Sequence, residues 1–170
     1  MRLHVLTACT RPENLPALAE SLSQPCYGPW EVCWHLRLDP DHCHVGGQRL
    51  KNDMLDQISD GWVCFLDDDT TLDAEFVRLA EVLSRNGASA VVVSQARADG
   101  SILRAARGNL CVGGIDIGQA IISRVLIDDT RIPLCYDGDG MFLAAVLNTP
   151  NVVFIDEVLS YHNRLEPVAA

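Results

Sequence analysis

Residues 62–71 read WVCFLDDDTT, and this stretch indicates both the fold of the chain and the position of its functional site. Its first half, Trp62 to Leu66, is an unbroken apolar run, which is typical of a central strand covered on both faces of a sheet. Three consecutive aspartates, Asp67, Asp68 and Asp69, follow directly. Ligands of open α/β sheets bind beyond the carboxyl ends of the strands, so we expect a binding site at these aspartates.

Three adjacent carboxylates need a compensating positive charge, because like charges this close raise each other's pKa. Mg²⁺ and Mn²⁺ bind hard oxygen ligands, so a divalent cation is a natural partner for this cluster. A solvated acidic loop is the alternative interpretation. The position of the cluster at the end of a predicted central strand favours the metal site.

Strand and helix patterns alternate around this stretch. Buried strands are predicted over Leu3 to Thr7, Trp30 to Leu36 and Ala90 to Val93. Apolar residues recur at helical spacing between the strands, and they define three predicted helix faces: Leu15, Leu18, Ala19 and Leu22; Leu50, Met54, Leu55 and Ile58; and Phe76, Leu79, Ala80 and Leu83. The order β-α-β-α-β-α-β predicts a mostly parallel sheet between helices.

Two local signals predict where helices begin and end. Thr10 and Glu13 have the spacing of a capping box, in which the hydroxyl caps the first helix and the carboxylate reaches back. Gly61 stands in the usual position of a glycine that ends the second helix.

The second half of the chain is less regular. Asp99-Gly100 predicts the turn of a hairpin over Arg97 to Gly108. The remaining predicted elements are a strand over Ala120 to Ile122, a short helix after Gly140 with Phe142, Leu143, Val146 and Leu147 on its buried side, and two late strands over Val152 to Ile155 and Val158 to Tyr161.

The composition is that of an ordinary globular protein. The chain has 170 residues, of which 48% are apolar and 21% charged, so we expect one domain over residues 1–170. The formal net charge of −10 argues against nucleic-acid binding, because an acidic surface repels phosphate backbones. A divalent cation can still bridge carboxylates to a small phosphorylated ligand. The sequence leaves a homo-oligomer open.

Two further patterns concern location and metal binding. The sequence predicts no signal peptide and no integral membrane segment, and its seven cysteines are odd in number and scattered, which predicts free thiols in the cytoplasm. His42-Cys43-His44 could bind a metal ion. Adjacent ligands rarely share one tetrahedral ion, so a polar loop is the favoured interpretation there.

The stretch from Phe65 to Thr70 resembles the D-x-D segment of family 2 glycosyltransferases of GT-A fold. Other segments follow in the family's order along residues 3–162. They are Thr7 to Pro12, similar to the first strand and turn; Lys51-Asn52-x-Met54-Leu55, similar to the family's R-N-x-A-L helix; Gly113 to Arg124, similar to the stretch that leads to the strand beneath the donor sugar; and Gly138-Asp139, where the family often has Glu-Asp. The resemblance implies a Rossmann-like GT-A domain with a mixed, mostly parallel central sheet between helices.

The resemblance also implies roles for individual residues. Asp67 and Asp69 would be the D-x-D pair that binds Mn²⁺ or Mg²⁺, with His162 as a further metal or phosphate contact. The residues implied in binding a UDP- or GDP-sugar are Thr7, Arg11, Asp39, Lys51, Asp67 and Asp68. Asp139 would be the catalytic base that deprotonates a hydroxyl of a saccharide or other acceptor, which implies inversion at the anomeric carbon.

Simpler interpretations remain for several of these residues. Arg11 and Lys51 could be surface cations, Asp39 could belong to a polar turn, and His162 could be structural. Asp139 could cap the helix that follows it. Two other functions also remain open: a non-catalytic module that binds sugar nucleotides, and a phosphatase similar to the haloacid dehalogenases, in which Asp67 would be the nucleophile of a D-x-D-x-T motif.

Overall fold

The computed structural model describes residues 1–23, 30–39 and 47–163, and their strands form one mixed sheet. The strands are β1 (Arg2–Cys9), β2 (Glu31–Leu38), β3 (Trp62–Phe65), β4 (Thr70–Leu72), β5 (Ala90–Arg97), β6 (Ile102–Leu103), β7 (Ala120–Ser123) and β8 (Val152–His162). Their order across the sheet is β2-β1-β3-β7-β5-β8-β4, and β6 pairs with β5.

Five of the eight strands point in the same direction, although their neighbours are of both kinds. β1 pairs in parallel with β2 and β3, and β5 pairs in parallel with β8. β7 is antiparallel to both β3 and β5, which leaves β1, β2, β3, β5 and β8 pointing one way. The predicted mixed, mostly parallel sheet is therefore confirmed.

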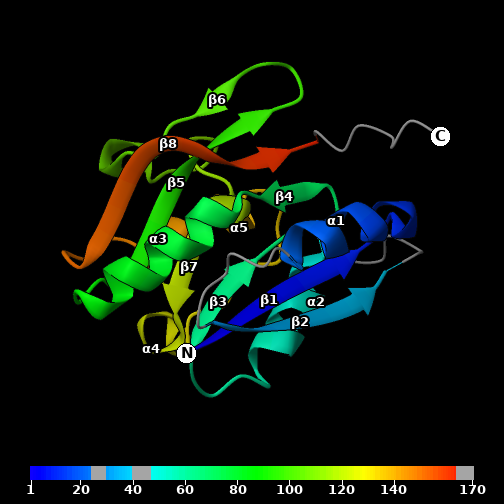
Figure 1. The fold of residues 1–170 in the computed structure, drawn as a ribbon, viewed down its shortest axis with the longest axis horizontal. Coiled ribbons are helices and arrows are strands. Elements are labelled where there is room, and N and C mark those ends of the chain that lie inside the picture. Colours follow the sequence, from blue (N-terminus) through cyan, green and yellow to red (C-terminus); the bar gives the residue numbers. More distant parts are fainter. Residues whose placement is uncertain (24–29, 40–46, 164–170) are drawn as a thin grey trace.

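Helices cover both faces of the sheet (Figure 1). They are α1 (Leu15–Leu22), α2 (Gln48–Leu55), α3 (Ala74–Arg85), α4 (Arg124–Ile127) and α5 (Gly138–Val146), with 3₁₀ turns η1 (Pro12–Asn14), η3 (Arg107–Asn109) and η4 (Ile117–Gln119). α1 and α3 pack on one face, and α2 and α5 pack on the other. None of the helices in the described part of the chain has the length and apolarity needed to span a bilayer.

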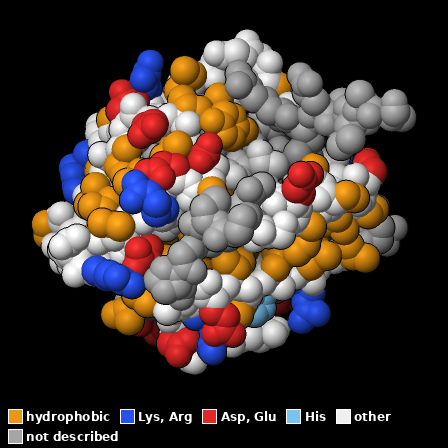
Figure 2. Space-filling model, in the orientation of Figure 1, with side chains coloured by type: hydrophobic (Ala, Val, Ile, Leu, Met, Phe, Trp, Pro, Cys, Tyr) orange, Lys and Arg blue, Asp and Glu red, His pale blue; other side chains and the backbone are white. Residues whose placement is uncertain are grey.

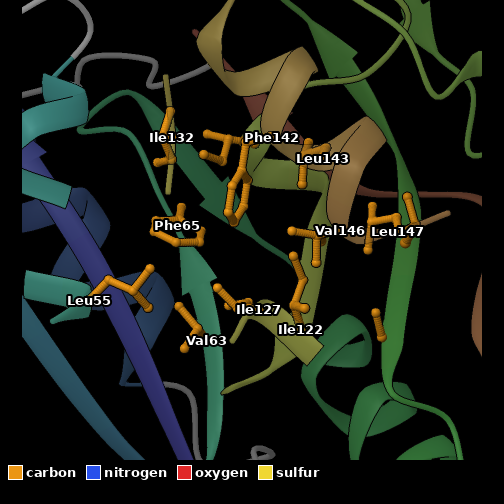
Figure 3. Close-up of a cluster of buried hydrophobic side chains, with 14 of the residues drawn as sticks. Leu55, Val63, Phe65, Ile122, Ile127, Ile132, Phe142, Leu143, Val146 and Leu147 are labelled. Carbon is orange, nitrogen blue, oxygen red and sulfur yellow. The ribbon is translucent and has the colours of Figure 1, made fainter. Parts of the chain in front are cut away.

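The two faces form separate hydrophobic cores. Val63 and Phe65 belong to the core under α2 and α5, whereas Cys64 and Leu66 belong to the core under α1 and α3. Figure 3 shows the first of these cores, where the ring of Phe65 meets Phe142 edge to face with centroids 5.4 Å apart. A strand buried on both faces needs apolar residues at every position, which explains the unbroken run from 62 to 66.

The charged residues lie mainly outside these cores. Figure 2 shows acidic side chains at several separate places on one face of the molecule, interspersed with basic and apolar ones.

The predicted capping box is wrong. α1 begins only at Leu15, after the 3₁₀ turn η1, and neither turn has a side-chain cap. The hydroxyl of Thr10 instead donates to Oδ2 of Asp68 at 3.1 Å. The backbone N–H and the hydroxyl of Thr10 both donate to the Asp68 carboxylate, and these bonds hold the segment outside the helix.

The predicted role of Gly61 is also wrong. α2 already ends at Leu55, six residues earlier. Gly61 has φ +81° at the start of β3, and a Cβ there would lie 2.8 Å from the carbonyl oxygen of Arg2. Gly61 is thus needed for the close approach of two backbones at the entry to β3.

Two further differences concern the strands. The two late strands predicted over Val152–Ile155 and Val158–Tyr161 are one strand, β8, with a bulge opposite Ser94. β4, which pairs with the end of β8, was not predicted. Both features arise from pairing between distant segments. The hairpin around Asp99-Gly100 is confirmed by the β5–β6 pairing.

Gly61→Ala should lower the free energy of unfolding by about 2 kcal/mol or more, because it adds a backbone clash to the strain of a positive φ. Gly87→Ala is the matched control, since Gly87 has φ +90° but no atom within 4 Å of an added Cβ. Urea unfolding of both variants separates the two effects. Equal losses in the two variants would show that the approach to Arg2 is unimportant.

Candidate functional site

The predicted site residues lie at one edge of the sheet, where the five co-directional strands end. Arg11 follows β1, Asp39 follows β2, and the three aspartates follow β3. His162 is the last residue of β8, and Asn163 after it donates its backbone N–H to the carbonyl oxygen of Asp69 at 2.9 Å. The fold therefore gathers residues from both halves of the chain.

Asp68, the middle aspartate, binds the segment after β1. Its Oδ2 accepts the backbone N–H groups of Thr10 and Arg11 at 2.6 and 2.7 Å, and its Oδ1 accepts Nη2 of Arg11 at 2.6 Å. Burial alone would raise the pKa of Asp68, but the hydrogen bonds from Arg11 and Thr10 lower it below its ordinary value. The side chain thus stays ionised as an anchor for the β1–α1 connection. Its predicted contact with substrate stays a prediction.

Arg11 also reaches the third aspartate. Its Nη2 lies 2.6 Å from Oδ2 of Asp69, so one guanidinium compensates two buried carboxylates. The Arg11 side chain is still 41% exposed. It is therefore a cation at the surface of the site, within reach of a ligand.

Lys51 compensates the first aspartate. Its Nζ lies 2.5 Å from Oδ1 of Asp67, and the Lys51 side chain is fully buried under α2. Burial alone would lower the pKa of Lys51, but the carboxylates of Asp67 and Asp139 raise it above its ordinary value. The interpretation of Lys51 as a surface cation is wrong, because the lysine is enclosed with its partner.

Asp139 lies in the first turn of α5, on the same edge as this ion pair. Burial raises the pKa of Asp139 to about 6, the positive charge of Lys51 opposes that rise, and the negative charge of Asp67 adds to it. The N-cap of α5 is Asp137, and no side chain caps the helix. The structure thus places Asp139 inside the helix rather than at the cap position.

Steric crowding explains why position 138 is a glycine. A Cβ at this position would lie 2.1 Å from the carbonyl oxygen of Pro133 and 2.8 Å from Nε2 of Gln48. The acidic side chain that the resembled family often carries here has no room in this chain. Gln48 instead fixes the loop before α5 by donating to the carbonyl oxygen of Cys135 at 2.8 Å.

Asp69 and His162 face each other across the site. Oδ1 of Asp69 lies 3.4 Å from Nδ1 of His162, and the hydroxyl of Thr70 lies 3.1 Å from the same nitrogen. A carboxylate oxygen suits Mn²⁺ or Mg²⁺, whereas an imidazole nitrogen is more typical of transition metals, so this donor pair fits Mn²⁺ better than Mg²⁺. Within the described ranges no three His, Cys, Asp or Glu side chains group as metal ligands.

The remaining predicted residues are placed as follows. Asp39 is buried at the end of β2, and its backbone N–H donates to the carbonyl oxygen of Cys9 at 2.8 Å. Thr7 is fully buried in β1, and its hydroxyl accepts Nε1 of Trp34 at 3.0 Å. Binding roles for both stay predictions. His42-Cys43-His44 lies outside the described residues.

A pocket of about 450 Å³ opens beside the Asp69–His162 pair. It is lined by Arg97, Ala98, Asp99, Asp116, Tyr136, His162 and Asn163. Of these, the sequence predicted only His162 as a site residue. Asp116 could have been noticed from the sequence, because Asp116 and Gln119 have capping-box spacing, and this capping box does form at η4. Tyr136 carries no comparable signal.

Comparisons with known proteins support the fold. No family model and no curated protein matches the chain. The crystal structure of S. aureus TarS 1-349 in complex with UDP-GlcNAc is similar with a TM-score of 0.73 and 17% identity, covering 98% of this chain and 60% of that chain. The same TarS fragment in complex with UDP has a TM-score of 0.68 and 16% identity, covering 95% and 60%.

A further solved structure has the same general fold. The crystal structure of A197 from STIV is similar with a TM-score of 0.62 and 20% identity, covering 95% of this chain and 85% of that chain. This chain spans about 60% of the TarS 1-349 structures. At these identities the matches show the fold, and they confirm the predicted GT-A-type arrangement of a mixed sheet between helices.

Lys51→Met should raise the pKa of Asp139 further above about 6, because the lysine charge favours the ionised carboxylate. ¹³C NMR titration of the Asp139 carboxyl group measures this directly. Arg131→Met is the control, since Arg131 pairs with the exposed Asp56 outside the site. An unchanged or lower pKa in Lys51→Met would contradict the proximity of the two charges.

Proposed function

We propose that this chain is a metal-dependent, inverting glycosyltransferase that moves a sugar from a UDP- or GDP-sugar to an acceptor hydroxyl. One observation carries the proposal: Asp139, a largely buried carboxyl group with a pKa of about 6, lies at the same sheet edge as the three-aspartate cluster. Perturbed carboxyl groups in such positions are typical of general bases. The fold shared with a protein crystallised with UDP-GlcNAc supports the choice of donor.

The donor diphosphate requires positive charge. Arg11 is the partly exposed cation at the aspartate cluster, so we assign it to the phosphates. Lys51 is enclosed against Asp67, so we assign it to holding that carboxylate in place for the donor's ribose or sugar. Asp39, at the end of β2, would contact the nucleotide base.

Asp69 and His162 would hold Mn²⁺ or Mg²⁺. A divalent cation bound there supplies Lewis-acid stabilisation of the negative charge that grows on the leaving diphosphate. Arg11 supplies part of the positive charge that the Asp69 carboxylate requires.

Asp139 would take the proton of the acceptor. A pKa near 6 leaves the group mostly ionised at neutral pH while keeping it a usable base. The acceptor hydroxyl loses its proton to the Asp139 carboxylate, its oxygen forms a bond to the anomeric carbon, and the bond to the diphosphate oxygen breaks on the opposite side. Inversion follows from this geometry.

The alternatives predict different behaviour. A non-catalytic binding module would bind a sugar nucleotide without transferring or hydrolysing it. A haloacid-dehalogenase-like phosphatase would hydrolyse p-nitrophenyl phosphate in a reaction that requires Asp67. Assays of sugar transfer and of p-nitrophenyl phosphate hydrolysis therefore distinguish the three functions.

UDP or GDP should raise the melting temperature more with Mn²⁺ than with EDTA, and Asp69→Asn should remove this difference. At a ligand concentration of about 100 Kd the wild-type gain is roughly 5–10 °C. Asp60→Asn is the control, because Asp60 is exposed beside Arg2 at the opposite edge of the sheet. A metal effect that survives in Asp69→Asn would place the cation elsewhere.

Asp139→Asn should lower kcat by roughly 10²-fold or more while the affinity for the donor is retained.

The same variant should change how stability depends on pH. The folded-state pKa of Asp139 is raised, so its favourable contribution to stability is complete below about pH 4 and is lost as pH rises through about 6. The variant should therefore gain stability relative to wild type between pH 4 and 7, as measured by urea unfolding.

Three results would count against the catalytic proposal. Near-wild-type activity of Asp139→Asn would remove Asp139 as the base. Tight donor binding by the wild type without transfer or hydrolysis, across a broad acceptor panel, would favour the binding module. Robust hydrolysis of p-nitrophenyl phosphate that is lost in Asp67→Asn would favour the phosphatase.

A further inference from the structure

Asp116 is a charged residue of the pocket that neither the D-x-D pair nor the proposed base accounts for. It precedes η4 and is partly buried, and it lines the 450 Å³ pocket together with His162. The Asp116 carboxylate also acts on the pKa values of Lys51 and Asp139, raising both. Asp116 thus lines the pocket and also lies close enough to Lys51 and Asp139 for its charge to act on both.

A buried polar network holds the Asp116 carboxylate in one orientation. Its Oδ1 accepts the backbone N–H of Gly118 at 3.0 Å and Nε2 of Gln95 at 3.2 Å. Gln95 is itself fully buried and lies 3.2 Å from the hydroxyl of Ser160, which is also fully buried and donates to the carbonyl oxygen of Gly118 at 2.9 Å. Both of these side-chain bonds of Gln95 use its Nε2, whereas its Oε1 is buried without a hydrogen-bond partner among the described residues. The bonds to Gly118 and Gln95 fix Oδ1 of Asp116, as the supporting residues of a positioned side chain do.

The same segment is packed against the candidate metal pair. A Cβ at Gly118 would lie 2.9 Å from Cγ2 of Thr70, the residue whose hydroxyl is next to Nδ1 of His162. The backbone of η4 therefore approaches Thr70, the residue after Asp69, so closely that position 118 has room only for a glycine. Gly118, two residues after Asp116, and Thr70 are thus in direct contact.

The hydrogen bonds of Asp116 within the described residues involve its backbone N–H, its backbone carbonyl oxygen and Oδ1. They leave Oδ2 as an acceptor on the pocket wall. A carboxylate oxygen in a pocket accepts hydrogen bonds from hydroxyl groups and repels a second carboxylate. In a donor whose diphosphate lies at Asp69 and His162, the group next to the diphosphate is the transferred sugar.

We infer that Asp116 determines donor specificity: its Oδ2 accepts a hydrogen bond from a hydroxyl of the transferred sugar, and the pocket takes neutral hexoses in preference to uronic acids. The inference rests on the proposed function, since it assumes a sugar nucleotide at the aspartate cluster. The exposed ring of Tyr136 on the same pocket offers the apolar surface that a sugar ring packs against.

The test is calorimetric titration of wild type and Asp116→Asn, in Mn²⁺, with UDP, UDP-GlcNAc and UDP-glucuronic acid. A parallel series uses GDP, GDP-mannose and GDP-mannuronic acid. Asn keeps an oxygen for Gly118 and Gln95, so the fold should be retained, which the melting temperature checks. Asp156→Asn is the matched control, because Asp156 is also hydrogen-bonded by a buried serine, Ser94, but lies outside the pocket.

In wild type we expect the neutral sugar nucleotide to bind about 10-fold or more tightly than the uronic acid. In Asp116→Asn we expect affinity for the neutral sugar nucleotide to fall about 10-fold, affinity for the bare diphosphate to change less than about twofold, and the preference over the uronic acid to shrink. Asp116→Glu keeps the charge, so it should retain discrimination against the uronic acid while losing affinity for the neutral sugar.

Equal losses for nucleotide diphosphate and sugar nucleotide in Asp116→Asn would show a merely structural role and overturn the inference, leaving the proposed function intact. Unchanged sugar affinity and discrimination would overturn it in the same way. Wild type that binds neither nucleotide series with Mn²⁺ would overturn the proposed function and this inference together.

Discussion

Compensation of three adjacent carboxylates at the end of one buried strand is the constraint on which the rest of the site depends. Asp68 and Asp69 share the guanidinium of Arg11, and Asp67 pairs with the buried Lys51. Without these cations, mutual repulsion and burial would favour protonation of the cluster. The two cations come from different elements, the β1–α1 connection and α2, so charge compensation also ties those elements to β3.

The three aspartates consequently have different environments despite their adjacency. Asp68 turns back into the fold and binds the backbone of the β1–α1 connection, whereas Asp69 keeps one oxygen toward His162. Asp67 is the most exposed of the three side chains. The middle aspartate of the run therefore holds the segment that carries Arg11, and the outer two are the carboxylates to which the proposed function assigns a cation or ligand.

The mixed sheet explains how distant segments reach this edge. β7 enters antiparallel between β3 and β5, so the segment before it, with Asp116 and η4, ends beside the carboxyl end of β3. α5 then places Asp139 over the Lys51–Asp67 pair, where burial and two neighbouring charges of opposite sign set its pKa. One sheet edge therefore carries an anchoring carboxylate, Asp68, together with the carboxylates to which we assign cation binding, proton transfer and recognition of a sugar.

Local patterns in the sequence determined the alternating strands and helices of the first half, the central position of β3 and the location of the aspartate cluster, because burial on both faces demands a continuous apolar run. They failed at Thr10, Gly61 and β8, where the outcome depends on contacts with Asp68, Arg2 and β5. The sequence also suggested Asp67, Asp69, Asp139 and His162, but not which cation faces which carboxylate. Only the tertiary structure decided the enclosure of Lys51, the anchoring role of Asp68 and the orientation of Asp116, because these follow from three-dimensional neighbours that no local spacing encodes.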